Sequence, residues 1–166
     1  MKDLYPLIKE YIGNDYTGLI TPELVLAIIK VESNFNSSAV RYEPNYTYLV
    51  SPHAVKPVEC SYRTEIELQK MSWGLMQVMG AVAREYGFRG WLTRLLSPDH
   101  NIYYGITHLK MLEKRGIEMT KRYRKHHYGL NDLISDYNDG DWRKRDNVLY
   151  ISKVKKAMAD YEKQYK

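Results

Sequence analysis

The sequence is poor in several features that would otherwise define a class of protein. It has a single cysteine, Cys60, among 166 residues, so the chain has no internal disulfide. No apolar run approaches the roughly 18 residues that a membrane span needs. The first residues, MKDLYPLIKEYIG, lack the apolar centre and the small-residue cleavage site of a signal peptide. We therefore expect no disulfide framework and no membrane span.

Tyrosine and positive charge are abundant instead. The chain has 16 tyrosines against two phenylalanines, and its formal net charge is +5. Tyrosine stacks on flat ligand faces, including sugar rings, and keeps a hydroxyl for hydrogen bonding. A cationic surface suits nucleic acid, anionic lipid or an acidic cell-wall polymer. The basic stretches at 121–129 and 141–147 are typical of solvated helix faces, and we expect no nucleic-acid partner.

Helical periodicity covers most of the chain. Thr21-Pro22 and Ser97-Pro98 each combine an N-cap residue with proline at the first helical position, which predicts helices beginning at Pro22 and Pro98. Gly140 is expected to close a helix that begins near residue 129. Further helices are predicted over residues 3–11, 63–72, 73–79, 81–87 and 147–165.

Residues 36–63 differ from the rest of the chain. They contain three of the six prolines and no lasting helical period. This composition predicts a long ordered loop, with a short hairpin around 46–50 as an alternative, and loops of this length are usually functional or mobile. We expect a mostly α-helical fold, in which residues 1–166 form a single domain with an insertion at about 36–63.

A carboxylic acid ends the most apolar predicted helix. The stretch LAIIKVES places Glu32 in the last turn, where burial and the negative end of the helix dipole are both expected to raise the pKa of its carboxyl. A carboxylic acid kept partly protonated near neutral pH is what general-acid catalysis requires. The alternative interpretation is a solvated glutamate at an ordinary helix end.

Within a stretch from about residue 21 to residue 158, five segments strengthen the catalytic interpretation. VESNFN, SWGLMQVMG, DHNIYYGITHL, SDYNDG and YISKV follow one another in this order. The set resembles the catalytic domain of the soluble lytic transglycosylases, in the lysozyme superfamily and related to goose-type lysozymes. The resemblance implies a lysozyme-like helical fold. It also implies cleavage of the β-1,4 bond between N-acetylmuramic acid and N-acetylglucosamine in peptidoglycan glycan strands.

The resemblance also implies roles for individual residues. Glu32 matches the acid and base of the Glu-Ser motif. Asn101 and Gly105 match a largely structural motif, in which the small residue allows close helix packing. The residues expected to bind or position substrate are Ser33, Gly74, Leu75, Met76, Gln77, Tyr137 and Asn138.

One carboxylate is thought to suffice in such enzymes. Glu32 would protonate the leaving oxygen and then take the proton of the sugar's own 6-hydroxyl, which leaves a 1,6-anhydro product. A hydrolytic goose-type muramidase with a second carboxylate is the alternative. Its candidates are Asp136, Asp139, Glu43 and Glu59. A non-catalytic wall-binding module is a third interpretation.

The connection between the Glu-Ser and Gly-Leu-Met-Gln motifs departs from the family pattern. It runs from Ser33 to Trp73, which is longer than usual in the family. Ser51, Ser61 and Ser72 all lie in it, and none is assigned to the place of the family serine.

Neither metals nor cofactors are expected. The spacing of His100 and His108, and the adjacent pair His126 and His127, resemble no zinc motif.

The site of action is expected to be the cell wall, in the periplasm or outside the cell. A chain of catalytic-domain size without a leader suits a phage lysin (endolysin) or a virion-associated wall-opening enzyme. It equally suits a bacterial domain cut from a longer chain. We expect a monomer.

Overall fold

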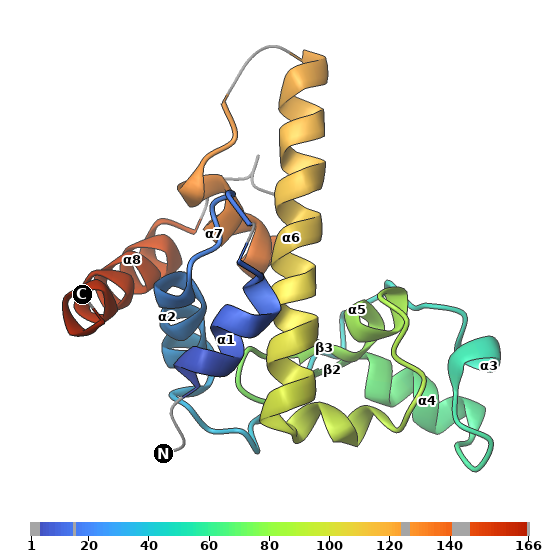
Figure 1. The fold of residues 1–166 in the computed structure, drawn as a ribbon. Helices are drawn as coiled ribbons and strands as arrows, with labels where there is room; N and C mark the ends of the chain where they lie inside the picture. Colours follow the sequence, from blue (N-terminus) through green and yellow to red (C-terminus); the bar gives the residue numbers. More distant parts are fainter. Residues whose placement is uncertain (1–3, 15, 124–126, 141–146, 166) are drawn as a thin grey trace. The chain divides into compact units, whose positions relative to one another are not determined.

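A computed structural model of the chain describes residues 4–14, 16–123, 127–140 and 147–165. These residues are mostly helical, as the sequence predicted (Figure 1). The helices are α1 (Tyr5–Ile12), α2 (Pro22–Ser33), α3 (Pro52–Val55), α4 (Tyr62–Gln69), α5 (Gly80–Glu85), the 3-10 helix η1 (Leu92–Leu96), α6 (Pro98–Tyr123), α7 (Leu130–Asp139) and α8 (Val148–Gln164). The strands are β1 (Val40–Tyr42), β2 (Met71–Trp73) and β3 (Val78–Met79).

The predicted helix boundaries at Thr21, Ser97 and Gly140 are confirmed. The Thr21 hydroxyl accepts a hydrogen bond from the Leu24 N–H at 3.2 Å, which caps α2. Helix α6 begins at Pro98. Helix α7 ends at Gly140, whose φ of 69° is the left-handed conformation that glycine adopts without steric cost.

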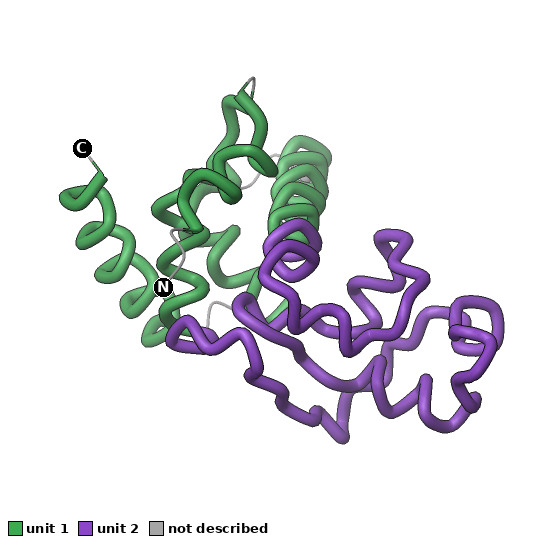
Figure 2. Tube along the Cα trace, turned by 60° about the horizontal axis from the view of Figure 1, so that its bottom comes forward, with its two compact units in different colours: residues 1–31, 106–166 green, residues 32–105 purple. Residues whose placement is uncertain are grey.

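Contacts divide the chain into two compact units (Figure 2). Unit 1 comprises residues 1–31 and 106–166, and unit 2 comprises residues 32–105. The prediction of a single domain stays a prediction. Among the helices of the described ranges, none has both the length and the apolar character needed to cross a bilayer.

Unit 1 has a helical core. Helix α7 packs against α8, and aliphatic side chains that are almost fully buried fill the interior. They include Ile8, Leu24, Ile28, Ile106, Leu109, Leu133 and Val154. Burying a side chain of this size contributes roughly 1.5–3 kcal/mol, so the core provides most of this unit's stability.

A buried carboxylate fixes the loop between α1 and α2 within unit 1. Glu113 accepts hydrogen bonds from the Tyr16 hydroxyl and, at 2.7 Å, from the Leu19 N–H. A Cβ atom at Gly18 would lie 2.7 Å from the Glu113 carboxylate, so the loop has no room for a side chain there. These contacts fix residues 16–19, which lie shortly before the start of α2.

Unit 2 contains an antiparallel sheet in the order β1-β2-β3. The helix predicted over residues 73–79 is wrong, because Trp73 ends β2 and Val78 begins β3. Gly74 and Gln77 have φ values of 67° and 49°, which no right-handed helix contains. A short apolar run fits a buried strand as well as a buried helix, so periodicity alone did not distinguish them.

The structure of the insertion differs from the hairpin at 46–50 that was predicted as an alternative. Residues 46–50 form no strand, and the strand of this region lies earlier, at Val40–Tyr42, where it pairs with β2. Helix α3 follows within the insertion, and α4 begins at its end, with the Ser61 hydroxyl accepting from the Thr64 N–H at 3.0 Å. The insertion is therefore partly helical rather than a plain loop.

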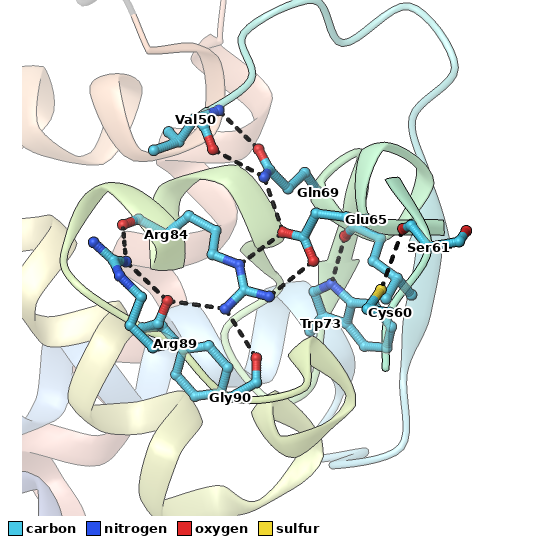
Figure 3. Close-up of polar contacts among 11 residues, drawn as sticks. Val50, Cys60, Ser61, Glu65, Gln69, Trp73, Arg84, Arg89 and Gly90 are labelled. Atoms are coloured by element: carbon cyan, nitrogen blue, oxygen red, sulfur yellow. Dashed lines mark hydrogen bonds and ion pairs between the residues drawn. The ribbon is translucent and has the colours of Figure 1, made fainter. Parts of the chain in front are cut away.

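A buried ion pair organises the rest of unit 2 (Figure 3). Arg84 donates to both oxygens of Glu65 at 2.8 and 2.9 Å, and both side chains are fully buried. Gln69 donates to Glu65 at 2.9 Å and exchanges two hydrogen bonds with the backbone of Val50. The ion pair thus joins α4 to α5, and Gln69 connects it to Val50 in the middle of the insertion.

Candidate active site

Glu32 lies in the last turn of α2 and is partly exposed, while Ile28 and Ile29 on the preceding turn are fully buried. Asn34 and Phe35 follow with φ values of 50° and 64°. A left-handed conformation costs a residue other than glycine roughly 1–2 kcal/mol. Asparagine often adopts this conformation directly after a helix, whereas a bulky residue such as Phe35 rarely does, so the backbone strain beside Glu32 lies mainly at Phe35.

A hydrogen bond connects the end of α2 to the turn between β2 and β3. The Ser33 hydroxyl donates to the Leu75 carbonyl at 2.7 Å, and both residues belong to unit 2. This bond places the residue after Glu32 against the segment that was predicted to bind substrate. Two motifs more than 40 positions apart in the sequence are thereby brought together.

The buried side chain of Asn101 forms hydrogen bonds with the backbone of that turn. Its oxygen accepts from the Met76 N–H at 2.7 Å, and its nitrogen donates to the carbonyls of Trp73 and Leu95 at 2.7 and 2.9 Å. A Cβ atom at Gly74 would lie only 2.5 Å from the Asn101 nitrogen. The turn therefore needs glycine at 74 for two reasons, the contact and the positive φ.

The apolar residues of the turn support it from inside. Leu75 is 2 % exposed and Met76 is fully buried. A Cβ atom at Gly105 would lie 2.3 Å from the Met76 sulfur. Helix α6, which contains Gly105, therefore approaches the β2–β3 turn this closely only because residue 105 has no side chain. This agrees with the packing role that the sequence predicted for Gly105. Any contact of Leu75 or Met76 with substrate would involve the backbone.

The side-chain amide of Gln77 is hydrogen-bonded to other groups of the protein. Its nitrogen donates to the carbonyls of Ala39 and Gly74 at 3.2 and 2.8 Å, and its oxygen accepts from the Ser72 hydroxyl at 2.9 Å. Both amide hydrogens therefore have acceptors in unit 2. Of the three serines considered from the sequence, Ser72 is the one that these contacts connect to the turn.

Tyr137 and Asn138 belong to unit 1, near the end of α7. The Tyr137 ring lies 5.6 Å from the ring of His108, measured between centroids. Burial, with a smaller contribution from Arg115, lowers the pKa of His108 to about 4, so this imidazole is neutral at pH 7. The Asn138 oxygen accepts from the Asn147 amide at 2.5 Å.

The four candidates for a second carboxylate lie in different environments. Asp136 is buried and accepts a hydrogen bond from the Tyr128 hydroxyl at 2.7 Å, and burial and this carboxylate raise the pKa of Tyr128. Glu43 forms an ion pair with Arg41. Glu59 and Asp139 are exposed.

Within residues 4–14, 16–123, 127–140 and 147–165, no three histidine, cysteine, aspartate or glutamate side chains are grouped so that they could hold a metal ion. His126 lies outside these residues. The expectation that the protein uses no metal stays a prediction.

Sequence reasoning missed one feature of this site. The Ala39 carbonyl accepts hydrogen bonds from the Gly74 N–H and from the Gln77 side chain, at 2.7 and 3.2 Å. A backbone carbonyl has no residue signature, so no motif search would have found it.

Comparison with known proteins identifies one family. The model of the transglycosylase SLT domain matches residues 12–159, which is most of the chain. No curated protein and no solved structure matches.

Proposed function

The chain belongs to the transglycosylase SLT domain family, and from this premise we propose that it is a peptidoglycan lytic transglycosylase with Glu32 as its acid and base. The bond cleaved is the β-1,4 linkage between N-acetylmuramic acid and N-acetylglucosamine. The observation that carries the proposal is the hydrogen bond from Ser33 to Leu75, which joins the turn of α2 that contains Glu32 to the Gly74–Gln77 turn.

The reaction needs one group that first gives and then takes a proton. Glu32, protonated, gives its proton to the leaving glycosidic oxygen. The N-acetyl group of the muramic acid assists at the anomeric carbon. The Glu32 carboxylate then removes the proton of the 6-hydroxyl, whose oxygen bonds to the anomeric carbon and closes the 1,6-anhydro ring. No water is consumed.

The remaining predicted residues have supporting roles in this proposal. Ser33 and Asn101 hold the turn, and the backbone of Gly74, Leu75 and Met76 lines the path of the glycan. Gln77 positions the turn because its amide hydrogens are bonded to Ala39 and Gly74. Tyr137 and Asn138, on α7 of unit 1, stay predicted substrate-binding residues on the family resemblance alone.

The hydrolytic muramidase is the alternative to this reaction. It requires a second carboxylate to activate water. The hydrogen bond between Tyr128 and Asp136, within a buried environment, makes Asp136 a structural residue of unit 1 rather than a base for water. This observation argues against Asp136 alone, and Glu43, Glu59 and Asp139 stay as candidates for the second carboxylate.

The biological setting is also part of the proposal. Action on the cell wall follows from the family, while a phage lysin, a virion-associated enzyme and a bacterial domain of a longer chain all accord with the sequence. We retain a monomer as the working state. Zymography of wall from several bacteria would identify the type of wall that the protein opens.

The mass of the products tests the reaction type. Purified peptidoglycan is digested in water enriched in ¹⁸O, and the released muropeptides are weighed. The proposal predicts anhydro-muramyl ends that are one water lighter than reducing ends and contain no ¹⁸O. Reducing ends labelled with ¹⁸O would establish a muramidase. Binding of wall without any product would favour the non-catalytic module.

A further inference from the structure

The outer strand of the sheet in unit 2 has an open edge. Strand β1 pairs with β2 on one side only, with Arg41 opposite Ser72. The Gly74 N–H donates to the Ala39 carbonyl at 2.7 Å, and the Glu43 N–H donates to the Lys70 carbonyl at 3.0 Å. Because hydrogen-bonded residues alternate along an antiparallel strand, the N–H and C=O groups of Val40 and Tyr42 point away from β2.

The two outward residues are accessible. Val40 and Tyr42 are each 46 % exposed, and their side chains share one face of the strand. Among the described residues no other strand pairs with this edge. Valine and tyrosine favour extended backbone, and neither proline nor glycine interrupts β1. The edge therefore offers alternating donors and acceptors in a conformation suited to pairing.

This edge is continuous with the candidate site. The Ala39 carbonyl, directly before β1, accepts from the backbone of Gly74 and from the side chain of Gln77. At the other end of the strand, the Tyr42 hydroxyl donates to Glu67 on α4 at 2.6 Å. The edge is thus fixed at both ends, and a ligand bound along it would lie beside the turn that the glycan is proposed to follow.

We propose that the edge of β1 binds the peptide stem of peptidoglycan in an extended form, through the backbone of Val40 and Tyr42. This rests on the proposed function. The successive amide bonds of an extended stem provide N–H and C=O groups that can pair with a strand edge, whereas each sugar of the glycan has only one amide, that of its N-acetyl group. Three strand residues span roughly 10 Å, which suits a stem of a few residues and is short for a partner protein's strand.

A binding measurement tests the proposal without any turnover. Backbone amide signals of ¹⁵N-labelled protein are followed by NMR while a disaccharide–tetrapeptide muropeptide is added. The same titration is made with the disaccharide that lacks the peptide. We expect the amides of Val40 and Tyr42 to shift and to exchange more slowly with the muropeptide only. The Arg41 amide, which faces Ser72, should change least. Equal shifts with both probes, or none at Val40 and Tyr42, would overturn the proposal.

Substitutions at Val40 test its role in substrate preference. Val40→Pro removes an outward N–H without removing a ladder bond, while Val40→Ala keeps that N–H and serves as the matched control. The proposal predicts that Val40→Pro lowers kcat/KM on peptide-bearing glycan chains roughly 2- to 10-fold. On glycan chains from which an amidase has removed the peptide, Val40→Pro and the parent should have equal kcat/KM.

The outcomes separate this inference from the proposed function. Equal losses on both substrates, or no loss on either, would contradict the role of the edge while leaving the enzyme's reaction intact. A parent protein that cleaves neither substrate would refute the proposed function, and the NMR titration would still decide whether the edge binds peptide. Circular dichroism tests whether Val40→Pro is folded. If this variant is unfolded, the NMR titration of the parent decides whether the edge of β1 binds the peptide.

Discussion

Removal of the Asn101 side chain should destabilise the protein strongly. Asn101→Ala leaves the Met76 N–H and the Leu95 carbonyl without this side chain, while the Trp73 carbonyl loses one donor and keeps its pairing with Val78 in the sheet. Each buried group without a partner costs roughly 1–3 kcal/mol, and two together cost roughly 2–6 kcal/mol. Water entering the vacated space reduces this, so we expect a loss of about 2–4 kcal/mol in the free energy of unfolding. That is a large part of the roughly 5–15 kcal/mol that stabilises a typical domain.

The assay is urea unfolding followed by circular dichroism. Asn45→Ala, at an exposed position, is the matched control and should change the free energy of unfolding by less than about 0.5 kcal/mol. Asn101→Asp keeps the acceptor for Met76 but places a second oxygen against two carbonyls. It should therefore be at least as destabilising at pH 7, and less so in acid, where the protonated carboxyl regains a donor. An Asn101→Ala protein within about 1 kcal/mol of the parent would refute the reasoning.

Three further predictions concern packing, charge and pH. Gly105→Ala should cost about 1–3 kcal/mol in thermal unfolding because its Cβ overlaps the Met76 side chain, and adding Met76→Ala should cost less than the sum of the single changes. Arg84→Met should cost about 3–5 kcal/mol by leaving Glu65 buried and unpaired, whereas the double variant with Glu65→Leu should recover part of this; no recovery in urea unfolding would contradict the account. The unfolded state binds a proton at His108 near pH 6.5 and the folded state only near pH 4, so stability should fall by about 3 kcal/mol as pH falls through this window. His108→Gln should flatten the dependence of stability on pH, and an unchanged pH profile would refute the role of His108 in it.

The helix boundaries were predictable because their causes are local. A threonine or serine before proline satisfies the first orphan N–H groups of a helix, and a glycine after the last turn adopts the left-handed conformation. These signals need only neighbouring residues. The starts at Pro22 and Pro98 and the end at Gly140 followed from them.

The hairpin of unit 2 was not predictable in the same way. An apolar stretch from Trp73 to Met79 satisfies a helix or a buried strand equally. Its conformation depends on Asn101, which lies more than 20 positions away, and on strand β1, which begins inside the insertion. Propensity cannot register such distant partners, and tertiary contacts override it.

The candidate site was predicted as a set of residue types rather than as a set of contacts. Glu32, Ser33 and the turn from Gly74 to Gln77 were identified through the family resemblance, and the Ser33 hydrogen bond joins them in unit 2. The sequence assigned Gln77 to sugar contact, yet its amide hydrogens bond to backbone carbonyls. Which polar side chains are already satisfied is a property of the folded chain alone.

The central claim is that Glu32 performs the proton transfers, and the rate of wall cleavage by Glu32→Gln tests it most directly. Purified peptidoglycan is digested with the parent, with Glu32→Gln and with Glu118→Gln, a control at an exposed glutamate on α6. Because general acid–base catalysis contributes roughly 10²- to 10⁴-fold, Glu32→Gln should lose at least about 100-fold, while its unfolding curve and the Glu118→Gln rate stay like the parent's. A folded Glu32→Gln protein that cleaves peptidoglycan as fast as the parent would contradict the claim.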